Sequence, residues 1–355
     1  MSQSILILPG DGIGPEVASA AKACLQAVAK LEGLDFTFSE AAFGGAGIDA
    51  CGEPLPEETL KAAEAADAIF LGAVGGPQWD HALKRPEQGL LGLRKALGLF
   101  ANLRPVKVFK GLEYLSPLKE DRVAGADVLI VRELTGGLYF GEKREGEDEA
   151  FDGCSYSRAE VSRIAEIGFK AAQSRKGTLT SVDKANVLAT SRLWRKTVND
   201  LSSQYPDVTV DHLYVDAAAM ALVTHPARFD VIVTENLFGD ILSDEAAVVA
   251  GSIGLLGSAS LGASGPGLFE PIHGSAPDIA GQDKANPSGA IASAAMLLRY
   301  GLDQPKAADR LEAALEAALQ EDERTADLGG TAKGSAFAQS VLAHIQTAQV
   351  MEPAQ

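Results

Sequence analysis

The sequence predicts an α/β protein in which strands of a parallel sheet alternate with helices. Short, wholly apolar runs recur along the chain, and they are followed by turns and then by segments with helical spacing. A wholly apolar run is typical of a strand buried on both faces. Alternation of strands with helices is typical of a parallel sheet that helices cover on both faces. The length of 355 residues fits two such domains, at about 150 residues each.

The first predicted strand covers residues 4–8, and a Pro-Gly break follows it. Pro15 then stands where a first helical residue is favoured, and apolar residues continue at helical spacing from Val17 to Leu31. The same alternation predicts strands at 68–71, 127–131, 178–182, 208–215 and 231–233, and helices near 87–98 and 158–173. From Ser288 onward the sequence favours Ala- and Leu-rich helix. No Pro/Ser-rich linker is present, so the two domains are expected to pack closely or to share chain segments.

A run of charged residues at 142–149 lies between two β-like segments, 138–140 and 154–156. Charge of this density is typical of a solvated loop, and the flanking segments favour a hairpin. We therefore predict a hairpin whose tip faces solvent.

Composition excludes several classes of partner. Lys and Arg number 31 and Asp and Glu 48, which gives a net charge of −17. A chain this acidic is repelled by nucleic-acid phosphates and anionic lipids. No apolar stretch suits a membrane span, and residues 1–4 lack the basic region of a signal peptide. Cys24, Cys51 and Cys154 never form a Cys-x-x-Cys pair, as expected of reduced thiols, so we predict a cytoplasmic protein without nucleic-acid or membrane partners.

Four charged residues follow predicted strands: Arg132, Lys184, Asp216 and Asp240. In open parallel sheets, ligands bind beyond the carboxyl ends of the strands. One such residue has an ordinary surface explanation, but four at equivalent positions indicate a ligand site.

Asp240 and Asp244 are spaced i, i+4 in a segment that opens a predicted helix. Both carboxylates would lie on one face, where they repel unless a cation separates them. Hard oxygen ligands without His or Cys suit Mg²⁺ or Mn²⁺. The alternative is that the acids only favour the positive end of the helix dipole. Asp216, as a third carboxylate, favours the metal site.

The predicted helix near 87–98 presents Glu87, Leu90, Leu91 and Arg94 on one face. A core-facing stripe would be apolar throughout, whereas this mixture suits a pocket wall that holds an anion and a branched alkyl group. The guanidinium groups that could grip a dicarboxylate are those of Arg94, Arg104 and Arg132.

Two glycine-containing segments are candidates for cofactor binding. Residues 10–14 form G-x-G-x-G, which is not the dinucleotide fingerprint, and no acid about 20 residues on ends a second strand. The better candidate comprises His273, Gly274, Ser275, Ala276, Pro277, Asp278, Ile279 and Asn286. Its small residues let backbone amides approach a ligand. The Asp278 carboxylate could accept both ribose hydroxyls and would repel a 2′-phosphate, so it favours NAD over NADP.

Together these motifs resemble the isocitrate/isopropylmalate family of β-decarboxylating dehydrogenases nearly from end to end. The matching segments are 8–16, 72–77, 99–105, 132–141, 183–188, 236–245 and 273–286. The resemblance implies a non-Rossmann fold of two interleaved α/β domains. Residues 1–99 with 252–355 would bind the cofactor, and residues 100–251 would carry the dimer interface and the metal and catalytic groups. It also implies a homodimer in which Lys184 and Asp216 enter the partner's site and residues 138–156 form a dimer arm.

The resemblance is closest to members that act on 3-isopropylmalate, and it implies NAD-dependent oxidative decarboxylation of (2R,3S)-3-isopropylmalate to 4-methyl-2-oxopentanoate and CO₂, in leucine biosynthesis. It makes Lys184 the base and Tyr139 the proton donor. The implied ligand groups are Arg94, Arg104, Arg132 and Asp216 for the substrate, Asp216, Asp240 and Asp244 for the metal, and Gly75, Gly76 and Glu87 as further cofactor contacts. Glu87, Leu90 and Leu91 would set substrate specificity, because isocitrate-specific relatives carry a hydroxyl group on this helix. The Asp278-Ile279 pair resembles NAD enzymes, whereas NADP-using isocitrate relatives carry Lys-Tyr.

Three alternatives remain open. A sibling enzyme acting on D-malate or tartrate can have a similar specificity helix. A non-catalytic regulatory subunit is disfavoured because Tyr139, Lys184 and the three aspartates are intact. A Mg²⁺-dependent phosphoryl-transfer enzyme requires a phosphate cradle at a helix amino terminus, and the sequence has no such motif.

Overall fold

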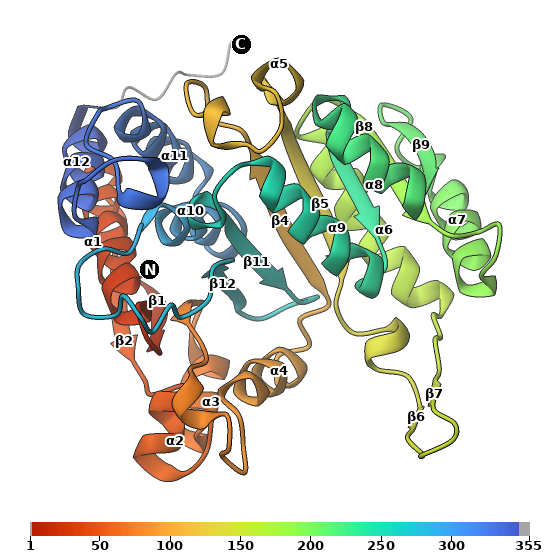
Figure 1. The fold of residues 1–355 in the computed structure, drawn as a ribbon, viewed down its shortest axis with the longest axis horizontal. Helices are drawn as coiled ribbons and strands as arrows, with labels where there is room; N and C mark the ends of the chain where they lie inside the picture. The colour runs from red at the N-terminus through yellow and green to blue at the C-terminus, as the bar shows by residue number, and fades with distance from the viewer. Residues whose placement is uncertain (1, 348–355) are drawn as a thin grey trace. The chain divides into compact units, whose positions relative to one another are not determined.

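The computed structural model describes residues 2–347, and the chain forms two compact units. Unit 1 combines residues 1–99 with 252–355, and unit 2 is the continuous stretch 100–251. Each unit is a sheet covered by helices (Figure 1). The predicted α/β class is therefore confirmed.

In unit 1 the strand order is β2-β1-β3-β12-β11. Its strands are β1 (Gln3–Gly10), β2 (Phe36–Glu40), β3 (Ala68–Ala73), β11 (Gly257–Leu261) and β12 (Gly267–Pro271). Its helices are α1 (Gly14–Glu32), α2 (Gly45–Cys51), α3 (Glu57–Ala65), α4 (Pro86–Ala96), α10 (Ser288–Met296), α11 (Pro305–Leu319) and α12 (Gly334–Thr347). Short turns are η1 (Pro77–Trp79), η5 (Ile253–Leu255), η6 (Leu297–Gly301, π-helical) and η7 (Ala326–Leu328). Every residue of β3 is buried, as the apolar run predicted.

In unit 2 the strand order is β4-β5-β10-β8-β9. Its strands are β4 (Ala101–Lys107), β5 (Asp127–Glu133), β8 (Thr178–Asp183), β9 (Thr209–Tyr214) and β10 (Val231–Thr234). Its helices are α5 (Glu120–Val123), α6 (Arg158–Gln173), α7 (Ala189–Ser202), α8 (Val215–Thr224) and α9 (Asn236–Val249), with short turns η2 (Glu113–Leu115), η3 (Gly137–Tyr139) and η4 (Pro226–Arg228). Helix α6 begins at its predicted position because Ser157 and Glu160 form a reciprocal capping box.

The sheet is mostly parallel, as predicted, but two pairs of strands are antiparallel. β11 runs antiparallel to β12, and β4 runs antiparallel to β5. The β11–β12 connection is only residues 262–266, which is too short for a helical crossover and instead makes a hairpin with Gly265 at φ +81°. The sequence does not predict strands at β4, β11 or β12, so it does not predict their direction.

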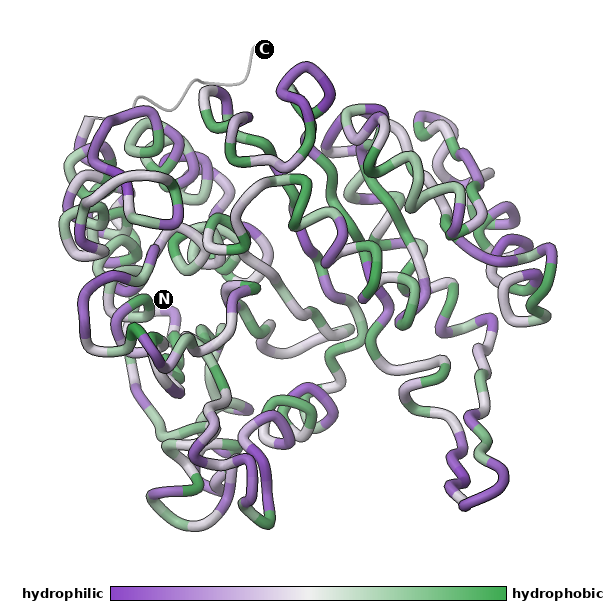
Figure 2. Tube along the Cα trace, viewed as in Figure 1, coloured by the Kyte–Doolittle hydropathy of each residue, from purple (hydrophilic) through white to green (hydrophobic). Residues whose placement is uncertain are grey.

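The hairpin is present, but its strands are shorter and lie closer to the tip than predicted. β6 (Lys143–Arg144) pairs with β7 (Phe151–Asp152), both inside or beside the charged run. The expected β-like segments at 138–140 and 154–156 are wrong, because Gly137–Tyr139 is a 3-10 turn and 154–156 are not strand residues. The tip is exposed and hydrophilic, as predicted (Figure 2). Its role as a dimer arm stays a prediction.

The three cysteines differ in environment, and all are free thiols. Cys24 lies in the buried face of α1, where burial raises the pKa of its thiol to about 12. Cys51 is exposed and Cys154 is half-buried. Among residues 2–347, no helix has both the length and the apolar character that crossing a bilayer requires.

Candidate active site

The centre of the site in unit 2 is a contact among three predicted residues, Arg132, Tyr139 and Asp240. Arg132 lies at the carboxyl end of β5, Tyr139 ends the turn η3, and Asp240 lies on the second turn of α9. The Arg132 Nη1 group forms an ion pair with Asp240 Oδ1, and the Tyr139 hydroxyl donates to Asp240 Oδ2 at 2.8 Å. The structure thus brings a cation, a carboxylate and a phenol together at one strand end.

The phenol of Tyr139 is held in its protonated form. Desolvation raises the pKa of Tyr139 above its ordinary value of 10.0, and the hydrogen bond to the Asp240 carboxylate raises it further. A phenol with a raised pKa keeps its proton at neutral pH and can donate it to a developing carbanion. This state is the one that the predicted role of Tyr139 requires.

Asp244 lies one helical turn beyond Asp240, and it too forms an ion pair with an arginine. Arg104 Nη1 is 3.0 Å from Asp244 Oδ1 and donates to Ser243 Oγ at 2.7 Å. The Asp244 side chain remains 72% exposed, so its oxygens are open to a further ligand. Two carboxylates on one face of α9, each beside a guanidinium, provide both hard oxygen ligands and anion-binding groups.

Lys184 and Asp216 form a second charged pair in unit 2. Lys184 follows the end of β8, Asp216 lies in the first turn of α8, and Lys184 Nζ is 2.5 Å from Asp216 Oδ1. The lysine ammonium lowers the pKa of the Asp216 carboxyl below its ordinary value. The buried Asp183 fixes this strand end, because its carboxylate accepts from Arg195 at 2.8 and 2.9 Å.

The four predicted charged residues follow strands that lie side by side and run parallel, and within the chain these residues form two ion pairs. Neighbouring strands β5 and β10 supply the Arg132–Asp240 pair, and neighbouring strands β8 and β9 supply the Lys184–Asp216 pair. β9 is two strands from β10, or about 10 Å at the usual spacing of about 4.8 Å. Accordingly, no group of three or more His, Cys, Asp or Glu residues in the described part of the chain could hold a metal ion. The expectation that Asp216 acts in a partner's site is compatible with this separation and stays a prediction.

Helix α4 of unit 1 carries the predicted specificity residues, and the structure distinguishes them. Leu91 is 57% exposed, whereas Leu90 is half-buried against the core cluster that contains Leu93. Arg94 is half-buried, with Nη2 bonded to Glu270 on β12 at 2.8 Å and a buried Nε that has no partner among the described residues. Of the two leucines, Leu91 is the one available to a ligand.

The glycine turn 10–14 has a structural role that the sequence reasoning missed. The buried Asp11 carboxylate accepts from the amides of Gly45, Ala46 and Gly75 at 2.8–2.9 Å, and burial raises its pKa in spite of these donors. Gly12, at φ +58°, lies so close to the loop at Ser275 that an added Cβ would be 2.0 Å from the Ser275 carbonyl oxygen. The turn therefore supports two predicted cofactor segments, one at Gly75 and one at Ser275.

The loop at 273–286 presents an unpaired acceptor. His273 Nδ1 contacts the Gly274 carbonyl oxygen at 2.9 Å. A carbonyl only accepts, so Nδ1 carries the proton and Nε2 carries a lone pair. Nε2 is buried without a partner among the described residues, and burial lowers the pKa of His273, which keeps the ring neutral. A buried acceptor of this kind indicates a donor on a ligand.

The other predicted cofactor residues are less uniform. Asp278 is exposed and Ile279 is half-buried, so both are accessible. Asn286 is buried, and its amide already bonds to Asp327 and Ser288, each at 2.9 Å. Gly75 has φ +107°, and an added Cβ there would be 2.8 Å from the Glu87 carboxylate, which brings these two predicted residues together.

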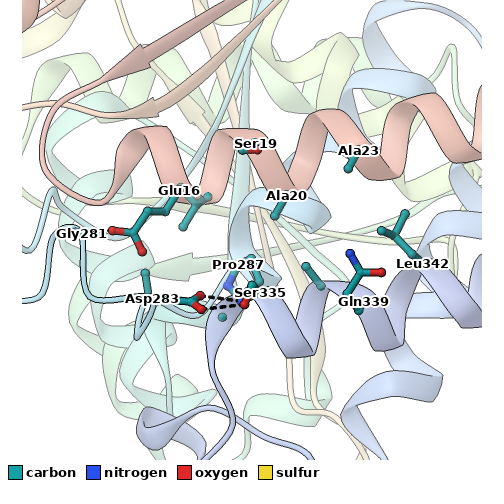
Figure 3. A pocket seen from close by; sticks show the side chains of 14 residues that line it. Glu16, Ser19, Ala20, Ala23, Gly281, Asp283, Pro287, Ser335, Gln339 and Leu342 are labelled. Carbon is teal, nitrogen blue, oxygen red and sulfur yellow. Dashed lines mark hydrogen bonds between the residues drawn. The ribbon is translucent and has the colours of Figure 1, made fainter.

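A cavity of about 390 Å³ lies between α1, α12 and residues 281–287 (Figure 3). The Glu16 carboxylate accepts from the Gly281 amide at its edge, and Asp283 accepts from Ser335 Oγ at 2.6 Å. None of the residues predicted to bind the cofactor lines this cavity. The two carboxylates instead fasten the later part of the 273–286 loop, at Gly281 and Asp283, to the flanking helices.

Comparisons with known proteins identify the family of the chain. Residues 4–351 match the family model described as isocitrate/isopropylmalate dehydrogenase. A 3-isopropylmalate dehydrogenase of Staphylococcus aureus (strain bovine RF122 / ET3-1) is 57% identical over 93% of this chain and 95% of its own length. One from Listeria innocua is 54% identical over 98% and 99%.

Two solved structures are also similar over almost their whole length. Isocitrate dehydrogenase from Methylococcus capsulatus gives a TM-score of 0.85 at 34% identity, covering 97% of this chain and 99% of that one. The apo form of a β-decarboxylating dehydrogenase from Thermococcus kodakarensis gives 0.82 at 37% identity, covering 97% and 96%.

Proposed function

The chain belongs to the isocitrate/isopropylmalate dehydrogenase family, and we propose that it catalyses the NAD-dependent oxidative decarboxylation of (2R,3S)-3-isopropylmalate to 4-methyl-2-oxopentanoate and CO₂, a step of leucine biosynthesis. The observation that carries the chemistry is the contact of Arg132, Tyr139 and Asp240 at the end of β5. It combines anion binding, a metal ligand and a proton donor. We place the enzyme in the cytoplasm, where its thiols stay reduced.

The preference for 3-isopropylmalate over isocitrate rests on α4. Leu91 offers an exposed apolar side chain and no donor for a third carboxylate. An isopropyl group would contact it favourably, whereas an additional carboxylate would be desolvated there without a partner. Glu87 and Leu90 complete this face of the helix.

The proposed carboxylate-binding groups are the guanidinium groups of Arg94, Arg104 and Arg132. Arginine provides planar pairs of N–H donors that match a carboxylate. Two observations are consistent with this role: Arg94 Nε has no partner in the described part of the chain, and the Arg132 guanidinium lies at the end of β5.

A divalent metal fits Asp240 and Asp244, whose oxygens are hard donors on one helix face, and the partner's Asp216 would complete the set. When bound, Mg²⁺ or Mn²⁺ supplies positive charge that lowers a hydroxyl pKa and stabilises the charge left by departing CO₂. Lys184, once it has lost its own proton and is a neutral amine, would accept the proton of the substrate hydroxyl at Nζ. Tyr139 would donate its hydroxyl proton to the carbon from which CO₂ has left, and its raised pKa keeps that proton available.

NAD fits the loop at 273–286, where His273 Nε2 is a buried acceptor that has no partner within residues 2–347. Hydride acceptance is the chemistry that NAD supplies there. The proposed contacts are Gly75, Gly76, Glu87, His273, Gly274, Ser275, Ala276, Pro277, Asp278, Ile279 and Asn286. The exposed Asp278 carboxylate favours NAD because it would repel the 2′-phosphate of NADP.

We propose a homodimer formed through unit 2, while unit 1 binds the cofactor. The packed pair α8 and α9 exposes several large apolar side chains, namely Met220, Val223, Ile241 and Val248, which are 39–64% exposed. An apolar face of this kind is typical of an interface between chains. Dimerisation through it, with the 138–156 arm, would let Lys184 and Asp216 act in the partner's site.

The direct test is NADH formation by the purified protein with 3-isopropylmalate, D-malate, tartrate and isocitrate in parallel, each with Mn²⁺ and with chelator. Metal-dependent turnover that is fastest on 3-isopropylmalate supports the proposal. Preference for an unbranched acid would move the chain to a sibling activity. No turnover on any substrate would leave the family standing and remove support for the catalytic assignment.

A further inference from the structure

Asn236, the first residue of α9, lies between Arg132 and the turn that precedes Tyr139. The proposed mechanism does not use its side chain. Its side chain is 1% exposed and is hydrogen-bonded through both its oxygen and its nitrogen. Asn236 Oδ1 accepts from Arg132 Nε at 3.1 Å and from Arg132 Nη2 at 2.8 Å. Asn236 Nδ2 donates to the Gly136 carbonyl oxygen at 3.3 Å. One buried amide thus contacts both the arginine and the turn that precedes Tyr139.

The first contact orients the arginine. Asn236 binds the Nε–Nη2 edge of the guanidinium, so Nη1 is directed toward Asp240. The aliphatic part of Arg132 lies against Gly239, where an added Cβ would be 2.6 Å from Arg132 Cγ. The stem and one edge of Arg132 are therefore fixed by α9, which also carries Asp240.

The second contact belongs to a clamp on the turn. The buried Glu133 carboxylate accepts from the amides of Thr135 and Gly136, at 2.7–3.0 Å, and from Thr135 Oγ1 at 2.7 Å. Glu133 holds the amide side of the turn, and Asn236 holds its carbonyl side at Gly136. Tyr139 follows three residues later.

We propose that Asn236 is a positioning residue that aligns Arg132 for substrate binding and the Tyr139 turn for proton donation. This inference rests on the proposed function for its kinetic consequences but not for its structural one. Oδ1 serves Arg132 and Nδ2 serves the turn, so the two roles can be separated by substitution.

Three variants separate the roles. Asn236→Leu keeps the approximate volume and removes both contacts. Asn236→Asp keeps an oxygen acceptor for Arg132 but places a second oxygen against the Gly136 carbonyl. Thr197→Val is the control, because Thr197 is a fully buried residue of α7 whose hydroxyl bonds only to the Leu193 carbonyl in its own helix.

With 3-isopropylmalate as substrate, we expect Asn236→Leu to raise KM for the acid and to lower kcat, each by roughly tenfold or more, as expected for buried hydrogen bonds. KM for NAD should not change. Asn236→Asp should lower kcat with a much smaller change in KM for the acid. A purely structural role predicts instead that both Asn236 variants resemble Thr197→Val, with lower Tm and unchanged kcat and KM; that result would overturn the inference.

Hydrogen–deuterium exchange on the intact protein gives a readout that does not depend on activity. Both Asn236 variants should speed exchange of the amides at 135–140, and Thr197→Val should not. If the wild-type protein lacks activity on 3-isopropylmalate, the proposed function fails while this measurement still decides the inference. Unchanged exchange at 135–140 in both variants would contradict the positioning role.

Discussion

In unit 2 the candidate substrate groups are side chains held by other side chains, whereas in unit 1 the candidate cofactor loop is held by backbone contacts at Ser275. Asp240 meets Arg132 and Tyr139 through ionic and hydroxyl groups. The loop at Ser275 instead meets the backbone of Gly12 and Ile13, whose amide donates to the Ser275 carbonyl at 2.8 Å. Function in unit 2 should therefore be sensitive to side-chain chemistry, and function in unit 1 to the presence of a Cβ.

The largest effect is expected in unit 2. Lys184→Met removes the proposed proton acceptor and should lower kcat by about a thousandfold, within the usual range for a catalytic acid or base. The mass in solution and the Mn²⁺ affinity should stay near wild type. The matched control is Lys196→Met, because Lys196 also pairs with an aspartate but lies on the exposed side of α7. Steady-state kinetics with light scattering checks this, and an active Lys184→Met enzyme would remove Lys184 from the mechanism.

The next largest effect is expected at the cofactor loop. It shows whether side chains of unit 1 determine the choice between NAD and NADP. Asp278→Lys combined with Ile279→Tyr should shift the ratio of kcat/KM for NAD over NADP by about a hundredfold, since a charge repulsion becomes an attraction worth a few kcal/mol. Initial rates with both cofactors measure the ratio. An unchanged ratio would mean that the ribose does not bind at this loop.

A smaller effect separates the two leucines of α4. Leu91→Ser should lower kcat/KM for 3-isopropylmalate by tens-fold relative to D-malate, because an apolar contact of this size is worth about 1–3 kcal/mol. Leu91 is exposed, so Tm should hardly change. Leu90→Ser should lower Tm as well, since Leu90 packs on the core. Equal losses on both substrates would place the specificity contact elsewhere.

The smallest effect is expected in unit 1, where it tests the close backbone contact between Gly12 and Ser275. Gly12→Ala should destabilise unit 1 by about 1–3 kcal/mol and raise KM for NAD several-fold, because its Cβ would collide with the Ser275 carbonyl. Gly33→Ala is the control, as Gly33 has a similar positive φ with nothing within 4 Å of an added Cβ. Thermal unfolding and NAD kinetics of both variants separate close approach from backbone strain. Identical behaviour of the two variants would remove the supporting role of the glycine turn.

The sequence predicted site residues where a charged residue followed an apolar strand, because such a residue lies at the carboxyl end of the strand, where ligands bind. Arg132, Lys184, Asp216 and Asp240 could be identified in this way, although not their division into two pairs. That division depends on strand order, which local patterns do not contain.

Asp11 and Asn236 were missed for a different reason. They act by binding backbone or guanidinium groups that are distant along the chain, such as the Gly75 amide for Asp11 and Arg132 for Asn236. A polar residue between two glycines, or at the first turn of a helix, was a signal, but each position has an ordinary local explanation. Only the three-dimensional contacts distinguish a role in long-range binding from this local explanation.

The interleaved order of segments sets an order of events during synthesis of the chain. β3 has β12 as its parallel neighbour, and α1 packs against α10 and α12, yet the whole of unit 2 is translated between these partners. Unit 2 is continuous and has every strand of its sheet before β12 leaves the ribosome. The nascent chain therefore carries β1 and β3 with an open apolar edge while unit 2 folds. We expect this nascent form, more than the finished protein, to depend on chaperones.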